Sequence, residues 1–342
     1  MSARRIAAAL LLAALPAGEP LEFPRDHGAH PAAAMEWWYY TGHLTDPSGG
    51  EYGFQVTFFR VKELYLAHFA WTDVGRGRFV YEEKTHLGLP GMAGAAEGRL
   101  DVSNEGWSAR SEGNRVRLVA GRRDLGELVL RLTPSKPPVL NGEAGFSRKG
   151  PGENDYTHYV TIPRFSAAGT LTSPKGVPLR LTGTAWFDHE WGPGVLPVDA
   201  VGWDWFALQL DDGSDLMLYR MRLPGDRASP FSAGTFAPRT GPPTPIRWGD
   251  VALASKSIWT SPHSRATYPA VWSLAVRSIG LDVTVTPLVA DQELATLKST
   301  GVTYWEGACR VEGTRSGRPI GGRAYVEMTG YAGRDVPGFS AK

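Results

Sequence analysis

Two short segments combine titratable side chains with tryptophans. Residues 186–191 read Trp-Phe-Asp-His-Glu-Trp, and residues 202–206 read Gly-Trp-Asp-Trp-Phe. Charged groups are costly to bury unless they are paired or hydrogen-bonded. Setting them among aromatic side chains is therefore typical of a mostly apolar binding site with a few polar groups. Burial and neighbouring charge shift pKa values in such sites, so these segments predict general acid–base chemistry on a small molecule.

The candidate catalytic residues are Asp188, His189 and Asp204. Alternate residues of a strand share a face, so Asp188 would face one way with Glu190, and His189 the other way. His189 has two interpretations: it lines the site, or it ties a domain junction together through buried hydrogen bonds. The neighbours of Asp204 on both sides are tryptophans, which would face away from it in a regular strand.

Acids also adjoin aromatic residues near both ends of the chain. Glu36 precedes two tryptophans and should be paired, with Arg60 as a candidate partner. His68 lies between apolar neighbours and is either a proton shuttle or a satisfied core histidine. Together with the two tryptophan-rich segments, these positions give the predicted substrate-binding residues Glu36, Trp37, His68, Glu190, Trp191, Trp203, Trp205, Tyr304 and Glu306.

Several other chemistries lack support in the sequence. His27 and His30 are spaced like metal ligands, but no clear third ligand accompanies them and Pro31 follows directly, so no metal is expected. Glycine-rich nucleotide-binding motifs are absent, so no cofactor is expected. The net charge is +1 and no basic stripe runs along the chain, which argues against nucleic-acid binding. Cys309 is the only cysteine, so no intrachain disulfide can form.

The elements that position these groups are predicted to be β-strands, because long helical periodicity is absent. Turn signals such as Asp-Pro-Ser-Gly-Gly at 46–50 and Asp-Asp-Gly at 211–213 separate runs of alternating hydrophobicity. Spacing of about 8–12 residues indicates sandwiches or barrels. The expected strands are 36–44, 52–61, 65–73, 78–84, 107–111, 115–120, 126–133, 156–165, 177–187, 203–210, 214–223, 251–260, 270–276, 281–287, 304–313 and 322–330.

The N-terminus predicts export, and the middle of the chain predicts a domain boundary. Arg4 and Arg5 precede an apolar run over 6–15 and small residues near Ala17, which is the pattern of a signal peptide over 1–17; an ordinary buried helix is the alternative. The run is too short to span a bilayer. Glycines and prolines over 192–197 place a boundary near 197, giving domains over 18–197 and 198–342 with similar numbers of strands.

Motifs spread over about 300 residues resemble those of the AttH-like / carotenoid 1,2-hydratase family, also called lipocalin-like "predicted secreted hydrolases". They are FPRDHGAHP at 23–31, EWWYYTG at 36–42, FQVTFFR at 54–60, KPP at 136–138, DHEW at 188–191, GWDWF at 202–206 and YWEG at 304–307. The resemblance implies an all-β fold of two lipocalin-like, calycin-type β-barrel domains packed together. It also implies a periplasmic or secreted location, and an ABC transporter as partner.

The resemblance also assigns roles to residues. The histidine and tryptophan of the hydratase motif correspond to His189 and Trp191, and a tyrosine on a following strand corresponds to Tyr219, which joins the substrate-binding candidates. In the hydratases an aspartate follows that tyrosine, whereas here the chain continues with Arg220 and no carboxylate. This departure places carotenoid hydration itself in doubt.

Two functions follow as hypotheses. One is a cofactor-independent enzyme that hydrates, isomerises or cyclises an apolar unsaturated lipid or isoprenoid by acid–base catalysis. A cation formed on the substrate would be stabilised by indole faces. The other is a non-enzymatic carrier that exchanges a lipid or small molecule with an ABC transporter. A co-purified ligand and a search for its turnover would separate them.

Overall fold

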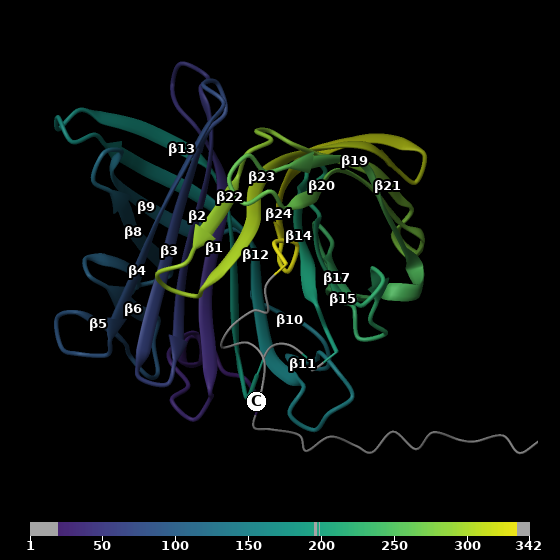
Figure 1. Cartoon of the computed structure of the whole chain (residues 1–342), viewed down its shortest axis with the longest axis horizontal. Coiled ribbons are helices and arrows are strands. Elements are labelled where there is room, and N and C mark those ends of the chain that lie inside the picture. The colour runs from purple at the N-terminus through teal and green to yellow at the C-terminus, as the bar shows by residue number, and fades with distance from the viewer. Residues whose placement is uncertain (1–19, 195–196, 198, 334–342) are drawn as a thin grey trace, which may run out of the picture.

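The computed structural model describes residues 20–194, 197 and 199–333, and they form two barrel-like sheets side by side (Figure 1). The predicted all-β fold of two packed barrels is confirmed. The only helices in the described part are three short 3-10 turns, η1 (Arg25–His27), η2 (Trp248–Asp250) and η3 (Arg277–Ile279). None of them has the length and apolar character needed to cross a membrane. The predicted signal peptide lies outside the described residues and stays a prediction.

The first barrel is a 13-stranded sheet in the order β4-β3-β2-β1-β13-β12-β9-β8-β7-β6-β5, with β10 and β11 also paired to β12. Its strands are β1 (Met35–Thr45), β2 (Glu51–Val61), β3 (Leu64–Asp73), β4 (Arg78–Leu87), β5 (Ala93–Ala95), β6 (Asp101–Asn104), β7 (Trp107–Glu112), β8 (Arg115–Arg122), β9 (Gly126–Pro134), β10 (Val139–Leu140), β11 (Phe146–Arg148), β12 (Tyr156–Thr172) and β13 (Pro178–Gly192). The Asp-His-Glu segment lies inside β13, and not beyond the end of a strand as the sequence suggested.

The second barrel is an 11-stranded sheet in the order β18-β17-β15-β14-β24-β23-β21-β20-β19, with β16 paired to β15 and β22 to β23. Its strands are β14 (Gly202–Leu210), β15 (Asp215–Leu223), β16 (Arg227–Ala228), β17 (Ala233–Ala237), β18 (Thr244–Arg247), β19 (Val251–Thr260), β20 (Thr267–Val276), β21 (Leu281–Pro287), β22 (Glu293–Thr296), β23 (Val302–Arg315) and β24 (Arg318–Met328). The sequence missed the shortest of these, because two to five residues carry too little alternation to be recognised.

Each barrel encloses its own apolar core. The inward face of the first barrel carries residues such as Trp38, Phe58 and Phe165, and that of the second carries Phe206 and Trp272. A third apolar cluster lies between the barrels and draws on both sheets; it comprises Tyr39, Tyr159, Trp186, Trp205, Ala207, Met217, Tyr219, Met221, Ala308 and Tyr325. The central strands are therefore buried on both faces, one facing the barrel interior and the other facing the neighbouring barrel.

Close backbone approach and buried charges hold the two barrels together. A Cβ added to Gly53 would lie 2.7 Å from Cβ of Ala308 in the other barrel, so the contact requires glycine at that position. Asp215 of the second barrel is fully buried and pairs with Arg164 at 2.7 Å and Lys136 at 2.6 Å, both from the first. The Lys-Pro-Pro motif at 136–138 thus contributes to the interface between the barrels.

Candidate active site

A cavity lies between the two barrels, on the faces that they turn toward each other. Its volume, measured as the space open to the centres of water molecules, is about 100 Å³, several times what one water needs. Strands of both sheets and the loops next to them contribute its lining, which is Trp37, Tyr39, Thr57, Phe59, His68, Lys149, Tyr159, Asp188, Glu190, Trp203, Trp205, Tyr219, Met221, Thr300, Val302, Tyr304, Glu306, Glu327 and Thr329.

Strand periodicity decides which neighbours reach this cavity. On β13, Asp188 and Glu190 line it, whereas His189 between them faces the interior of the first barrel. On β14, Trp203 and Trp205 line it and the residue between them does not. Side chains alternate between the two faces of a strand, so each of these sequences supplies one set of groups to the cavity and another to a barrel core.

Asp188 is held by three hydrogen bonds on the wall formed by the first barrel. Tyr159 donates its hydroxyl to Oδ2 at 2.7 Å, while the Thr161 hydroxyl at 2.6 Å and the Trp186 indole N–H at 2.9 Å donate to Oδ1. Burial raises the pKa of Asp188 to about 7, although these hydrogen bonds oppose the rise. Trp205 donates in turn to the Tyr159 hydroxyl at 2.9 Å, which fixes the phenol between the two barrels. Asp188 can therefore exchange a proton near neutral pH.

Lys149 is a site residue that the sequence analysis missed. It follows β11, in the long irregular segment over 134–155, and its ammonium lies 3.1 Å from Glu190. The same ammonium lies over the rings of Tyr159 at 4.7 Å and Tyr219 at 4.1 Å. Burial lowers the pKa of Lys149, but the combined effect of Glu190, Tyr219 and Asp188 outweighs burial and the net shift is upward, which keeps the lysine charged. The unusual length of the segment was the available signal, because such loops are often functional.

The wall formed by the second barrel carries Glu306 on β23 and Glu327 on β24. These residues are directly opposite each other in the antiparallel register. Trp203 donates its indole N–H to Glu327 at 3.1 Å. Oε1 of Glu306 and the hydroxyl of Tyr39 make no hydrogen bond of regular geometry among the described residues, but the two side chains are close enough to interact with each other. Burial raises the pKa of Glu306 well above its ordinary value, and the charge of Glu327 raises it further.

His68 also lines the cavity, but its ring is engaged on both sides. Nδ1 lies 2.8 Å from the Tyr304 hydroxyl and Nε2 lies 2.8 Å from the Ser299 hydroxyl. Ser299 donates to Glu83 at 2.6 Å. Burial lowers the pKa of His68 to about 3, so the ring is neutral at physiological pH. A neutral, doubly bonded imidazole orients Tyr304 and does not carry a proton as imidazolium.

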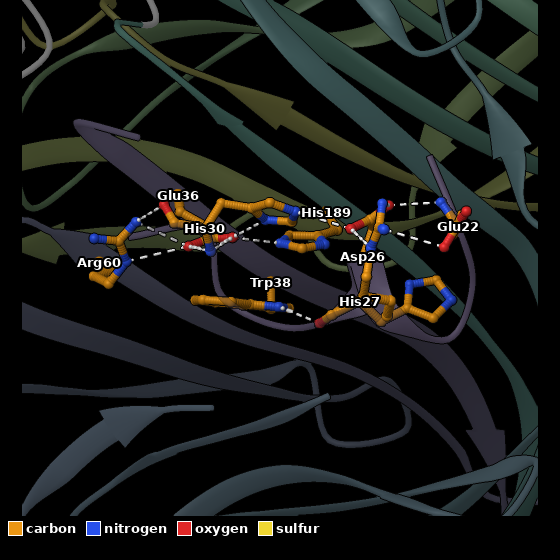
Figure 2. A network of polar contacts seen from close by, with 9 residues as sticks. Glu22, Asp26, His27, His30, Glu36, Trp38, Arg60 and His189 are labelled. Atoms are coloured by element: carbon orange, nitrogen blue, oxygen red, sulfur yellow. Dashed lines mark hydrogen bonds and ion pairs between the residues drawn. The ribbon is translucent and has the colours of Figure 1, made fainter. Parts of the chain in front are cut away.

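Glu36, His189 and Trp191 do not line the cavity, contrary to the expectation from the sequence. His189 Nε2 lies 2.9 Å from Glu36 Oε1, inside the first barrel, and its ring stacks on Trp38 (Figure 2). The same ring also adjoins Trp191. Arg60 binds Glu36 at 3.0 Å, which confirms the predicted ion pair. Of the two interpretations of His189, the geometry corresponds to a residue held in a buried hydrogen-bond network.

This network also fastens the segment that precedes β1. Glu36 accepts hydrogen bonds from the backbone N–H of His30 at 3.0 Å and lies 2.8 Å from Nδ1 of the same residue. Arg60 donates to the carbonyl of His30, and Trp38 donates to the carbonyl of His27 (Figure 2). Arg60 also donates to the carbonyl of Ala33. One buried carboxylate thus joins three segments that are far apart in the sequence.

The ligand atoms of His30, Glu36 and His189 lie within 4.8 Å of one another, close enough to share a metal ion. However, the guanidinium of Arg60 already contacts Oε2 of Glu36, and both histidines contact Oε1. A cation placed here would meet the positive charge of Arg60 and displace these bonds. The arrangement therefore fits a closed hydrogen-bond network better than a metal site.

Asp204 likewise lies outside the cavity. It is fully buried on the interior side of β14, where Arg220 donates to it at 2.7 Å and the Tyr331 hydroxyl at 2.8 Å. Arg222 lies 3.6 Å away. With these partners Asp204 is an internal ion-pair residue of the second barrel, because the alternation that directs both flanking tryptophans to the cavity directs it to the core.

The remaining candidates from the sequence are brought together in the cavity. Six different strands contribute these residues to the lining, which includes Trp37, His68, Asp188, Glu190, Trp203, Trp205, Tyr219, Tyr304 and Glu306. The sequence analysis missed Tyr39, Tyr159 and Glu327 besides Lys149. Glu327 in particular has no adjacent tryptophan or motif, and only its pairing with β14 and β23 brings it here.

A family model described as AttH-like matches residues 14–331 of the chain. The chain belongs to the AttH-like family. A solved structure described as AttH from Nitrosomonas europaea is 36% identical, with a TM-score of 0.84, and the alignment covers 93% of this chain and 98% of that one. The family resemblance predicted from the motifs is therefore confirmed.

The AttH-like fold is shared with an enzyme. Kievitone hydratase from Nectria haematococca has a TM-score of 0.74 at 18% identity, and the alignment covers 91% of this chain and 93% of that one. At this identity the likeness shows the fold alone. No curated protein matches the chain.

Proposed function

We propose that this AttH-like protein is a cofactor-independent, hydratase-like enzyme that acts on an apolar unsaturated small molecule, of the isoprenoid or lipid class, bound between its two barrels. The observation that carries the proposal is Asp188, a carboxyl group with a pKa of about 7 in a cavity lined by indoles and phenols. A group that titrates near working pH can take up a proton and release it in each cycle. The fold shared with a hydratase is consistent with this chemistry.

The contacts of Asp188 favour a role as proton acceptor. Three donors point at its two oxygens, and hydrogen bonds of this kind stabilise the carboxylate form. In the proposed reaction a protonated double bond becomes a cation, which the faces of Trp37 and Trp205 stabilise. Water adds to the cation, and Asp188 accepts the proton that the water releases. Loss of a proton from carbon instead of water addition gives isomerisation, and attack by a second double bond gives cyclisation.

The test begins with identification of any ligand that co-purifies, by mass spectrometry, and continues with that ligand and a panel of acyclic isoprenoid alkenes. Turnover in ¹⁸O-labelled water inserts one labelled oxygen if the reaction is hydration. In deuterium oxide, isomerisation and proton-triggered cyclisation insert deuterium without labelled oxygen. Failure of the protein to change any compound that it binds would reject the enzyme and leave the carrier.

Asp188→Asn is the decisive variant, because it keeps the size of the side chain and removes the titrating group. We expect turnover to fall by about 10²–10⁴-fold with little change in ligand affinity. Wild-type activity should rise with pH through about 7, since the acceptor must be ionised. Asp101→Asn, on β6 in a surface ion pair with Arg110, is the matched control and should retain full turnover.

The carrier hypothesis makes the opposite prediction. A carrier needs affinity but no titrating group, so Asp188→Asn would leave its transfer of ligand unchanged. We favour the enzyme because the described barrel interiors hold packed cores, while the cavity between the barrels concentrates four carboxyl groups with one lysine. Export by the predicted signal peptide and cooperation with an ABC transporter belong to the proposal in either case.

A further inference from the structure

The two glutamates on the second barrel differ from the other acidic residues of the cavity. Asp188 has three hydrogen-bond donors, and Glu190 has the Lys149 ammonium at 3.1 Å and the Thr157 hydroxyl at 2.5 Å. Glu306 and Glu327 have no cationic partner among the described salt bridges. Two carboxyl groups without a cation in a buried site are costly when both are ionised.

Their geometry makes them a pair. Glu306 and Glu327 are directly opposite across β23 and β24, where facing side chains have Cβ atoms about 4.5–5.5 Å apart. Both line the same cavity. Beyond the effect of burial, the charge of Glu327 reaches Glu306 and raises its pKa, and a pair of like charges of this kind retains one proton between its two members.

The surroundings decide which member carries the proton. The Trp203 indole N–H donates to Glu327 at 3.1 Å, and a donor of this type favours the ionised form. Oε1 of Glu306 is buried and makes no hydrogen bond of regular geometry in the described chain. Burial and the charge of Glu327 raise the pKa of Glu306 by more than its neighbour Tyr39 lowers it, so Glu306 is the member that keeps the proton. Glu306 is 1% exposed.

Among the described residues that line the cavity, the positive charge is that of Lys149, and its ammonium is paired with Glu190 at 3.1 Å on the opposite wall. The titratable groups near the pair are the phenols of Tyr39 on β1, Tyr304 on β23 and Tyr325 on β24, and the carboxyl groups of Asp188 and Glu190 on β13. His68 on β3 is neutral because burial lowers its pKa to about 3. The phenols and His68 leave the charge unchanged, the carboxyl groups of β13 add negative charge, and Lys149 is paired with Glu190, so the surroundings favour retention of a proton on the glutamate pair.

We propose that Glu306 and Glu327 form a carboxyl pair that shares one proton, and that Glu306 is the general acid that delivers this proton to the double bond of the substrate. The proposal rests on the proposed function and assigns its proton donor. Glu306 transfers its proton to one alkene carbon, and the new C–H bond leaves a cation on the other carbon. Water forms the C–O bond and gives a proton to Asp188 on the opposite wall. Exchange with solvent then returns a proton to Glu306 and removes one from Asp188.

The first measurement does not depend on activity. In protein labelled with ¹³C at the glutamate side-chain carboxyl, infrared spectra at pH 7 should contain the C=O stretch of a protonated glutamic acid. Glu306→Gln should remove that band, whereas Glu312→Gln, an exposed position on the same strand, should not. If the wild type has no such band, both glutamates are ionised and the proposal is overturned whether or not the protein is an enzyme.

The second measurement uses turnover and pH. Glu306→Gln should lower turnover by about 10²–10⁴-fold with ligand affinity and melting temperature retained. Glu327→Gln removes the charge that holds the proton on Glu306, so the alkaline limit of activity should move to lower pH. Glu312→Gln should change neither the turnover nor the alkaline limit of activity. If the pair had only a structural role, these variants would change the melting temperature without moving the pH profile of activity.

The outcomes keep this proposal separate from the proposed function. If wild type and Glu306→Gln are equally active while Asp188→Asn is inactive, the assigned donor is wrong and the enzyme stands. If neither the wild type nor any variant converts a compound that it binds, the proposed function is rejected and the donor role of Glu306 with it. Loss of activity in Glu306→Gln together with the lost infrared band supports the assignment.

Discussion

Replacement of Glu36 by glutamine tests whether the network inside the first barrel stabilises the fold. Glu36 is fully buried and accepts hydrogen bonds from Arg60, the backbone of His30 and the rings of two histidines. Burial raises its pKa, but the bonds from His189 and His30 outweigh burial and lower the pKa to about 2 from an ordinary value of 4.5. The Glu36→Gln variant keeps the shape of the side chain and removes the charge that holds these partners.

The stability that the Glu36 carboxylate contributes follows from the difference between its pKa in the folded and in the unfolded chain. At about 1.4 kcal/mol for each tenfold change in proton affinity, a pKa lowered from 4.5 to about 2 corresponds to about 3 kcal/mol of stability at neutral pH. Removing one partner of a buried ion pair costs about 3–5 kcal/mol in other proteins, which agrees in size. Because the folded pKa is the lower one, this stability is complete above about pH 4.5 and is lost as the pH falls toward 2.

Urea unfolding followed by tryptophan fluorescence measures this contribution. At pH 7 we expect Glu36→Gln to lower the free energy of unfolding by about 3 kcal/mol without a large change in the dependence on urea. The difference between variant and wild type should shrink as the pH falls from 4.5 toward 2. Glu51→Gln, which removes a half-exposed partner of Arg323, is the control and should cost at most about 1 kcal/mol. A loss below about 1 kcal/mol, or one that does not vary with pH, would refute the reasoning.

Three further predictions follow from the same structure. His189→Ala should lower the free energy of unfolding by about 2–4 kcal/mol, because it removes a buried ring and a bond to a carboxylate. The folded fraction should keep its turnover, and lost turnover with unchanged stability would instead make His189 a catalytic residue. Asp215→Asn should lower the urea midpoint, because Arg164 and Lys136 lose their shared partner between the barrels; an unchanged midpoint would mean that this contact does not stabilise the assembly. Fractionation should find the processed chain, starting near Gly18, in the cell envelope, and an intact chain in the cytoplasm would contradict export.

The sequence alone was sufficient for the fold class and for the family. Alternating runs, turn signals and the order of the motifs placed nearly all of the long strands, because period-two burial is a local property of each strand. Acids beside aromatic residues indicated the cavity only in part: Asp188, Glu190 and Glu306 line it, whereas Glu36 and Asp204 are buried in the barrel interiors. The pairing of Glu36 with Arg60 was foreseeable from the cost of burying a carboxylate alone.

Only the tertiary structure decided which face of each strand meets the ligand. In β1, β14 and the second half of β13 most residues on both faces are buried, so hydrophobicity does not distinguish the barrel interior from the side that meets the other barrel. Alternation correctly separated His189 from Asp188, but assigning one face to the cavity required knowing where the second barrel packs. Glu327 and Lys149 join the site through pairings and contacts between distant segments, which leave no local pattern in the sequence.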